Sequence, residues 1–290
     1  MKRRVFMGQA ALAGPLVWPA WARAAGESAP RLISLSGGMT EVVWRLGAER
    51  WVVATDTTSN YPAAAQRTAK VGYMRQLSAE GVLALQPTAV LGTHEAGPAS
   101  VLAQLRQAGV PLMLARADHS FQELLAKVRL AARASGLREA GQALEAELGT
   151  QWQQALRRIE QVRQQRRQRQ AAAPRALFVM NHGGRPQSAG RGTAAQAMLD
   201  LAGAVNALDV DQGYKALSAE AVAQARPDVI VTTTESVEAS GGLSGFWRHP
   251  GLAYTPAARQ QRVLVMDAMA LLGFGPRLPQ ALMDLHQGLS

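Results

Sequence analysis

The arrangement of apolar and polar positions repeats once along the chain. Residues 72–90 and 213–230 both carry a Gly-Tyr pair, then the pattern L-S-A-E-x-V-x-x-x-x-P, then an apolar run. The aligned positions lie 140 residues apart, and a repeat at that distance predicts two similar lobes. In each copy we expect the serine to cap a short helix and the proline to follow its end.

Short apolar runs alternate with stretches of helical spacing on both sides of the middle of the chain. Helices are expected at 40–46, 98–108 and 193–202, where apolar residues recur every three to four positions. Loops are expected at 57–67, 181–192 and 235–251. Buried strands are predicted at 31–36, 51–56, 89–93, 110–115, 175–180, 228–234 and 263–267. Because strands that alternate with helices form mostly parallel sheets, the sequence predicts an α/β fold with two Rossmann-like lobes.

The middle of the chain has a different character. Residues 121–170 have helical composition and no strand-like run, with breaks only near Gly136 and Gly149. We therefore expect a long helical backbone that joins the lobes. The predicted boundaries are a leader at 1–24, an N-terminal lobe at 25–118, a helical linker at 119–171 and a C-terminal lobe at 172–290.

The last part of this helical stretch is strongly basic, since residues 155–170 hold six arginines and one glutamate. Such a run can bind phosphate groups, or it can be the solvated face of a long helix. Leu156, Ile159 and Val162 recur at helical spacing and would pack inward, which favours the solvated face.

The first 24 residues are typical of an export signal. They combine a basic start, a mildly apolar middle and the small-x-small site Ala22-Arg23-Ala24, as secretory leaders do. Arg3-Arg4 is also similar to a twin-arginine signal. An uncleaved membrane anchor is the alternative, but the apolar run is short and is broken by Gly and Pro. We expect export to the periplasm by the Sec or the twin-arginine route.

Composition narrows the classes of function. The chain contains no cysteine, which excludes disulfides, thiolate metal sites and a cysteine nucleophile. The formal charge is +10, and it falls to +6 without the four basic residues of the leader. This surplus favours an anionic ligand or surface. Because no nucleic-acid-binding motif accompanies it, we expect no nucleic-acid partner.

Four segments carry a resemblance to a known family: VGYMRQLSAEGVLALQPTAVLG (71–92), SAGRGTAAQAMLDLAGAVNA (188–207), GYKALSAE (213–220) and LLGFGPRLP (271–279). Over nearly the whole mature chain, the sequence resembles the substrate-binding proteins of bacterial ABC importers for iron complexes and cobalamin, and within them the haem-binding HmuT type. The resemblance implies a monomer that takes haem, as ferric hemin, into a cleft between the lobes. It also implies delivery to an ABC permease dimer with its ATPase, downstream of an outer-membrane haem receptor.

The resemblance further implies that Tyr73 ligates the haem iron. A phenolate is a hard anionic oxygen ligand that suits Fe(III), and tyrosinate is an axial ligand of haem. Arg75, two residues on, could supply the cation that favours ionisation of the phenol. The plain alternative is an aromatic side chain that packs at the rim of a loop.

Other candidate residues follow from the same resemblance. His182, just before Gly183-Gly184, is a candidate second iron ligand, although it could equally be a loop histidine bonded to water. His94 is a weaker candidate. Arg191, at a helix entry, is a candidate for a haem propionate, or an ordinary exposed arginine. Tyr214 repeats Tyr73, but its copy is one residue shorter before L-S-A-E, so no ligand role is assigned to it.

Glu80 and Glu220 occupy the same position in the two copies of the repeat. As acids in the first turn of a helix, they favour the helix dipole by about 0.3–1 kcal/mol each. In related importers the matching glutamates dock onto arginines of the two permease subunits, and one carboxylate per lobe suits such a symmetric pair. Both roles are expected.

Three alternative functions remain for comparison. A ferric-siderophore or cobalamin carrier would use the same scaffold. A zinc or manganese carrier is disfavoured, because the chain has only five histidines and no His-rich loop. Enzyme activity is not expected, because there is no G-x-S-x-G elbow, no P-loop and no dinucleotide-binding fingerprint.

Overall fold

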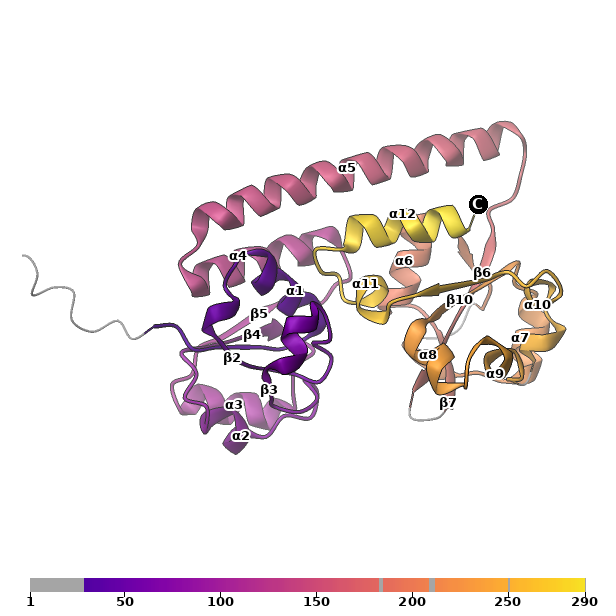
Figure 1. Ribbon diagram of the computed structural model, residues 1–290. Coiled ribbons are helices and arrows are strands. Elements are labelled where there is room, and N and C mark those ends of the chain that lie inside the picture. Colours follow the sequence, from indigo (N-terminus) through magenta and orange to yellow (C-terminus); the bar gives the residue numbers. More distant parts are fainter. Residues whose placement is uncertain (1–28, 183–184, 209–211, 250, 290) are drawn as a thin grey trace, which may run out of the picture.

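The computed structural model describes residues 29–182, 185–208, 212–249 and 251–289 (Figure 1). The expected leader at 1–24 lies outside the described residues. The described chain forms two lobes side by side, with one long helix running above both (Figure 1).

The N-terminal lobe contains a five-stranded, fully parallel sheet in the order β3-β2-β1-β4-β5. Its strands are β1 (Leu32–Ser34), β2 (Val52–Thr55), β3 (Ala69–Lys70), β4 (Ala89–Thr93) and β5 (Leu112–Ala115). Its helices are α1 (Gly37–Arg45), η2 (Glu49–Trp51), η3 (Ala63–Arg67), α2 (Ala79–Leu83) and α3 (Ala99–Gln107). The predicted alternation of strands and helices is confirmed in this lobe.

The helical stretch between the sheets consists of α4 (Phe121–Ser135) and α5 (Arg138–Gln168). Gly136 ends α4 in a left-handed conformation with φ 72°, which glycine adopts without strain. Gly149 lies inside α5 and does not break it. On α5, apolar side chains at helical spacing are buried: Leu144, Leu148, Trp152, Ala155 and Ile159. Arg157, Arg158, Arg167 and Arg169 are exposed, whereas Arg163 and Arg166 are half-buried and donate to the backbone carbonyls of Asp200 and Leu289. Among the helices of the described ranges, none is both long and apolar enough to cross a membrane.

The C-terminal lobe contains a six-stranded mixed sheet. Strands β11, β10, β6 and β8 are parallel, whereas β7 pairs antiparallel with both β6 and β9. The strands are β6 (Arg175–His182), β7 (Arg185–Ala189), β8 (Val205–Asn206), β9 (Tyr214–Ala216), β10 (Val229–Thr233) and β11 (Val263–Met266).

The helices of this lobe are α6 (Ala194–Ala202), α7 (Ala219–Ala225), α8 (Thr234–Ala239), α9 (Leu243–Trp247), η4 (Leu252–Tyr254), α10 (Pro256–Arg259), α11 (Ala268–Leu272) and α12 (Leu278–Gly288).

Two loop predictions in this lobe are wrong. Residues 181–192 include the end of β6 and all of β7, because pairing with β6 and β9 satisfies the backbone of a polar segment that has no apolar pattern of its own. Residues 235–251 contain most of α8 and all of α9. The side chain of Thr233 caps α8 by accepting from the Ser236 amide, a local signal that the Gly- and Ser-rich composition hides.

Alternating residues of the central strands divide the interior into a shared core and two outer cores. Leu32 and Leu91 of the first sheet, and Phe178 and Val231 of the second, belong to one continuous core beneath α5. Residues on the opposite faces pack against α2 and α3 in the N-terminal lobe, and against α7, η4 and α10 in the C-terminal lobe. Helices α2 and α7 therefore both lie on the sheet face that points away from α5.

Candidate ligand-binding cleft

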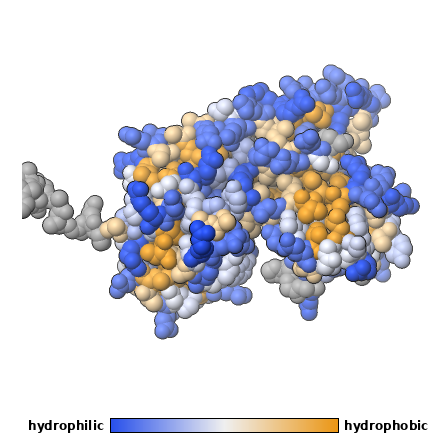
Figure 2. All heavy atoms as spheres, viewed as in Figure 1, coloured by the Kyte–Doolittle hydropathy of each residue, from blue (hydrophilic) through white to orange (hydrophobic). Residues whose placement is uncertain are grey.

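A cleft of about 440 Å³ lies between the lobes and takes its walls from both. The space-filling view shows a hollow between the two lobes (Figure 2). On the opposite edge of the molecule, mostly hydrophilic residues cover α5 (Figure 2). Ser36, two residues after β1, and Thr93, the last residue of β4, line the cleft. Ligands of parallel α/β sheets characteristically bind outside the carboxyl ends of strands, and the cleft has this location.

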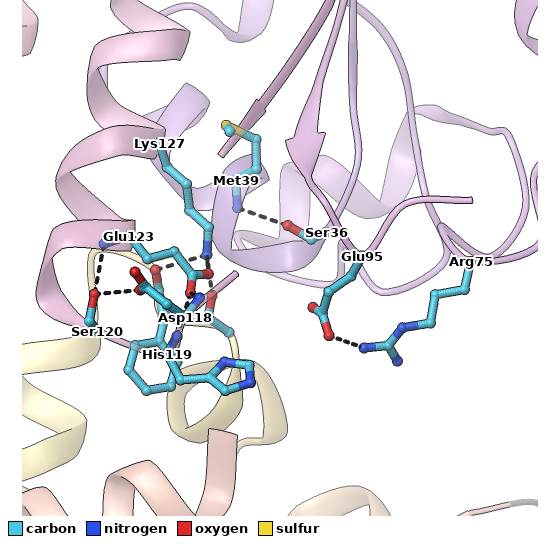
Figure 3. A network of polar contacts seen from close by, with 11 residues as sticks. Ser36, Met39, Arg75, Glu95, Asp118, His119, Ser120, Glu123 and Lys127 are labelled. Atoms are coloured by element: carbon cyan, nitrogen blue, oxygen red, sulfur yellow. Dashed lines mark hydrogen bonds and ion pairs between the residues drawn. The ribbon is translucent and has the colours of Figure 1, made fainter. Parts of the chain in front are cut away.

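Tyr73, Arg75 and Glu95 form a connected group on the N-terminal wall. Nη1 of Arg75 donates to the phenol oxygen of Tyr73 over 2.7 Å, and Nη2 forms an ion pair with the Glu95 carboxylate (Figure 3). Burial opposes the charge of Arg75, but attraction to Glu95 and Tyr73 outweighs burial and raises the pKa of the guanidinium. A permanent cation therefore lies against the phenol oxygen of Tyr73.

The loop that carries Tyr73 is fixed by its backbone. Gly72 has φ 90°, a conformation that strains any residue with a side chain. The Gly72 carbonyl accepts from the Thr57 amide at 3.0 Å, and the Tyr73 carbonyl accepts from the Gln76 amide at 2.8 Å. The ring of Tyr73 packs against the outer core of its lobe. Backbone hydrogen bonds thus fix the segment that carries Tyr73, and packing against the outer core holds its ring.

Tyr214 lines the same cleft from the C-terminal lobe, but it is held in a different way. It begins β9, and its phenol is hydrogen-bonded to the side chain of Thr193 and the backbone of Ala195, at the start of α6. Burial is the largest influence on this phenol and raises its pKa, despite those hydrogen bonds. The phenol of Tyr214 is therefore neutral at neutral pH, whereas a tyrosine that binds a metal ion as a phenolate must be ionised.

The floor of the cleft is formed by the first turns of α4 and the residues just before them. His119, Glu123 and Lys127 line it. Oε2 of Glu123 accepts from the amides of Asp118 and His119 at 3.0 and 2.8 Å. Oε1 of Glu123 lies 2.7 Å from Nζ of Lys127 (Figure 3). Burial lowers the pKa of Lys127, and the carboxylate of Glu123 opposes that effect. Sequence reasoning missed this group, whose only local signal is the i,i+4 spacing of an acid and a base.

Lys127 also joins the lobes. Its ammonium donates to the carbonyl oxygens of Gly273 and Phe274, at 2.9 and 3.1 Å, across the molecule from α4 to the segment before α12. A second contact lies close by, where Arg277 forms an ion pair with Glu41 of α1 at 2.6 Å. The floor of the cleft is thus a polar junction between the two halves of the chain.

The predicted site residues are distributed as follows. Tyr73 and Arg75 meet in the cleft. Arg191 is exposed and forms an isolated bridge with Gln212, next to Gly192 in the cleft wall. His182 ends β6, and its side chain lies outside the described residues. His94 is exposed after β4 and is not among the residues that line the cleft.

Glu80 and Glu220 are both exposed in the first turns of α2 and α7. Ser78 and Ser218 cap these helices as expected, since each serine oxygen accepts from the amide three residues on, at 3.3 and 3.1 Å. Both glutamates are therefore on the side of the molecule that points away from α5. Within the described residues, no group of three or more His, Cys, Asp or Glu side chains could hold a metal ion.

Comparison with known proteins gives consistent matches. The model of a family described as "Periplasmic binding protein" matches residues 32–270. BhuT, a periplasmic heme-binding protein solved in complex with two hemes, is 40% identical with a TM-score of 0.81, over 90% of this chain and 98% of that one. RhuT of Roseiflexus sp. RS-1, a periplasmic heme-binding protein in apo form, is 37% identical with a TM-score of 0.82, over 90% and 98%. A vitamin B12-binding protein of Yersinia pestis is 26% identical, over 76% of this chain and 75% of its own length.

Proposed function

The chain belongs to the periplasmic binding protein family, and we propose that it binds haem between its lobes and delivers it to the permease of an ABC importer. Members of this family are the substrate-binding proteins of such importers, which work with a permease and an ATPase. The observation that carries the proposal is the Tyr73–Arg75 pair in the cleft of a chain 40% identical to a heme-binding protein.

Tyr73 supplies the chemistry that ferric haem requires. The phenolate is a hard anionic ligand for Fe(III). The Arg75 guanidinium, whose Nη1 lies 2.7 Å from the phenol oxygen, can donate a charge-assisted hydrogen bond to a phenolate bound to iron. Glu95 holds the other edge of the guanidinium and so orients Arg75. We assign Tyr73 as the iron ligand, and Arg75 as the residue that stabilises its phenolate.

The C-terminal wall suits the apolar face of a flat macrocycle. Met180, Met269 and Leu272 line it, and unbranched thioether side chains adapt well to an aromatic surface. Gly192 and Gly213 lie in the same wall with φ 73° and 83°. Because glycines have no side chain, the backbone there can approach a planar ligand closely.

Two further assignments are part of the proposal. Arg191 is adjacent to the cleft wall and to the start of α6, where a haem propionate would also meet backbone amides. His182 ends β6, and its side chain lies outside the described residues. It is kept as the candidate for a second iron ligand, with a loop histidine bonded to water as the alternative.

Glu80 and Glu220 are assigned to docking on the permease. Each lies on the outer layer of its lobe, on the side away from α5, so the two carboxylates can face one partner together. Arginines on two permease subunits would pair with them. The relatives of this chain are periplasmic or lipoprotein substrate-binding proteins. We place the chain in the periplasm as a monomer, after export by the Sec or twin-arginine route and downstream of an outer-membrane haem receptor.

Haemin titration of the mature protein tests the iron ligand. Wild type should give a high-spin ferric spectrum with a phenolate charge-transfer band. Tyr73→Phe should lose that band and bind at least about tenfold more weakly, or about 1.4 kcal/mol. Tyr254→Phe is the matched control, because it removes the same hydroxyl from a tyrosine that is 80% exposed.

An unchanged spectrum and affinity in Tyr73→Phe would show that another group binds the iron. Little Soret absorbance with haemin in the wild type would instead favour the alternative, a carrier of cobalamin or a ferric siderophore.

A further inference from the structure

An exposed aromatic side chain lies beside the helix that carries Glu220. Tyr254 is 80% exposed, the largest value among the exposed large apolar residues of the described chain. It ends η4, whose first residue, Leu252, is buried in the same outer core as Val222 of α7. Single exposed apolar residues are ordinary on protein surfaces. Exposure alone therefore does not indicate a binding role for Tyr254, which depends instead on how its backbone is held.

The turn that carries Tyr254 is pressed directly onto the first turn of α7. A Cβ atom on Gly251 would lie only 2.8 Å from Cα of Ala219, the residue before Glu220. Gly251 also has φ 88°, so the position requires glycine on both grounds. The amide of Tyr254 donates to the Gly251 carbonyl at 3.3 Å. Tyr254 is therefore one tight turn away from the backbone that presents Glu220.

The chain on the other side of Tyr254 is fixed as well. The hydroxyl of Thr255 donates to the Leu252 carbonyl at 2.7 Å and accepts from the Ala258 amide at 3.1 Å, so it closes η4 and caps α10 together. Pro256 begins α10. With the backbone held at both ends, little chain entropy is lost when the tyrosine meets a partner.

We propose that Tyr254 is part of the surface that docks on the permease and that it enters an apolar recess there, an inference that rests on the proposed docking of Glu80 and Glu220. Tyrosine is enriched at the centres of protein interfaces, where a rigid aromatic ring often contributes much of the affinity. An acid and an aromatic ring carried by two turns packed on each other select a partner surface that offers a cation and an apolar hollow. The permease subunit under the C-terminal lobe should carry that pair.

The N-terminal lobe presents its acid without such a companion. In the C-terminal lobe the segment between β10 and β11 contains η4, whereas the corresponding segment between β4 and β5 of the N-terminal lobe, all of which the structure describes, contains α3 alone. Tyr61 is the exposed large apolar residue of that lobe within the described ranges, but the Arg277 guanidinium lies 4.0 Å from its ring centroid, at the lobe junction. The two lobes thus share the acid and differ in the aromatic anchor.

Association of the full-length mature protein with the purified permease–ATPase complex in nanodiscs tests this inference. Tyr254→Ala should weaken association at least about tenfold and leave the haemin titration unchanged, whereas Tyr254→Phe should stay close to wild type. Val205→Ser is the control, because Val205 is also exposed, at 47%, but lies on β8. Glu80→Ala and Glu220→Ala are measured in parallel, together with the thermal midpoint of every variant.

The outcomes distinguish the role of Tyr254 from the proposed docking through Glu80 and Glu220. If Glu220→Ala weakens association and Tyr254→Ala does not, the docking surface is correct and the aromatic anchor is wrong. If none of the three variants changes association, the assigned docking surface itself is wrong. A loss of haem binding in Tyr254→Ala would also contradict the inference, because it would move the role of Tyr254 to the cleft.

Discussion

Tyr73 and Tyr214 show how identical side chains acquire different chemistry from their neighbours. Both follow a glycine with positive φ, and both line one cleft. Arg75 donates to the phenol of Tyr73, whereas burial raises the pKa of Tyr214 and the start of α6 engages its oxygen. A permanent cation lies against the first phenol oxygen, whereas burial keeps the second phenol neutral. The repeat therefore places a tyrosine in the cleft from each lobe, at positions one residue out of register, and we propose only Tyr73 as an iron ligand.

Removing the Arg75 guanidinium should weaken haemin binding. Arg75→Ala should bind haemin about 10- to 150-fold more weakly than wild type, since a charge-assisted hydrogen bond contributes about 1.5–3 kcal/mol. Arg75→Lys should recover part of the affinity. Arg106→Ala removes an exposed arginine of α3 and should have no effect. Affinities come from Soret titrations, and equal binding by Arg75→Ala would contradict the assigned role.

At the scale of single elements, α4 does more than link the lobes. Its first turns place Glu123 and Lys127 in the floor of the cleft, where both side chains are almost fully buried. The pair is satisfied on every side, because backbone amides bind the acid and backbone carbonyls bind the base. Such a pair costs desolvation energy when it forms, but breaking it leaves one buried charge without a partner.

Removing one member of the Glu123–Lys127 pair should therefore destabilise the protein more than removing the charge of both. Lys127→Met should lower the free energy of unfolding by about 3–5 kcal/mol, because Glu123 loses its cation. The double variant Glu123→Gln with Lys127→Met should recover much of that loss. Urea unfolding followed by tryptophan fluorescence measures both. If the double variant is no more stable than the single one, charge is not the cause.

Single elements also show which parts of the fold and the site can be predicted from sequence. Strands β4 and β10 are buried along their whole length, so continuous apolar runs predicted them. Strand β7 is polar and forms through pairing with distant strands, which no local pattern reports. The proximity of Tyr73 and Arg75 was predictable from their spacing. The contacts of Arg75 with Glu95, and of Lys127 with Gly273, join residues 20 and 146 positions apart and needed the fold.

At the scale of the whole molecule, the lobes meet through tight packing as well as charge. Gly38 at the start of α1 lies so close to the C-terminal half that a Cβ there would be 2.0 Å from the Gly273 carbonyl oxygen. Glu41 and Arg277 form their ion pair beside this contact. The junction therefore needs the bare backbone of a glycine at position 38.

A methyl group at this junction should force the two halves apart. Gly38→Ala should cost about 1–3 kcal/mol of stability and should increase the radius of gyration in small-angle scattering. Gly149→Ala is the matched control, because its Cβ would meet nothing within 4 Å in the middle of α5. That variant should gain about 0.5–1 kcal/mol. Equal stability in both variants would contradict the tight junction.

The continuous core beneath α5 has a consequence for how the carrier is used. Because that core belongs to both lobes, a wide swing of one lobe would expose apolar surface to water. Loaded and empty forms should therefore keep nearly the same outline, and the partner cannot distinguish them by shape. Empty carrier should compete with loaded carrier for the importer, so uptake would fall when carrier is in excess over haem. Supply of cargo, rather than abundance of the carrier, would then set the rate of import.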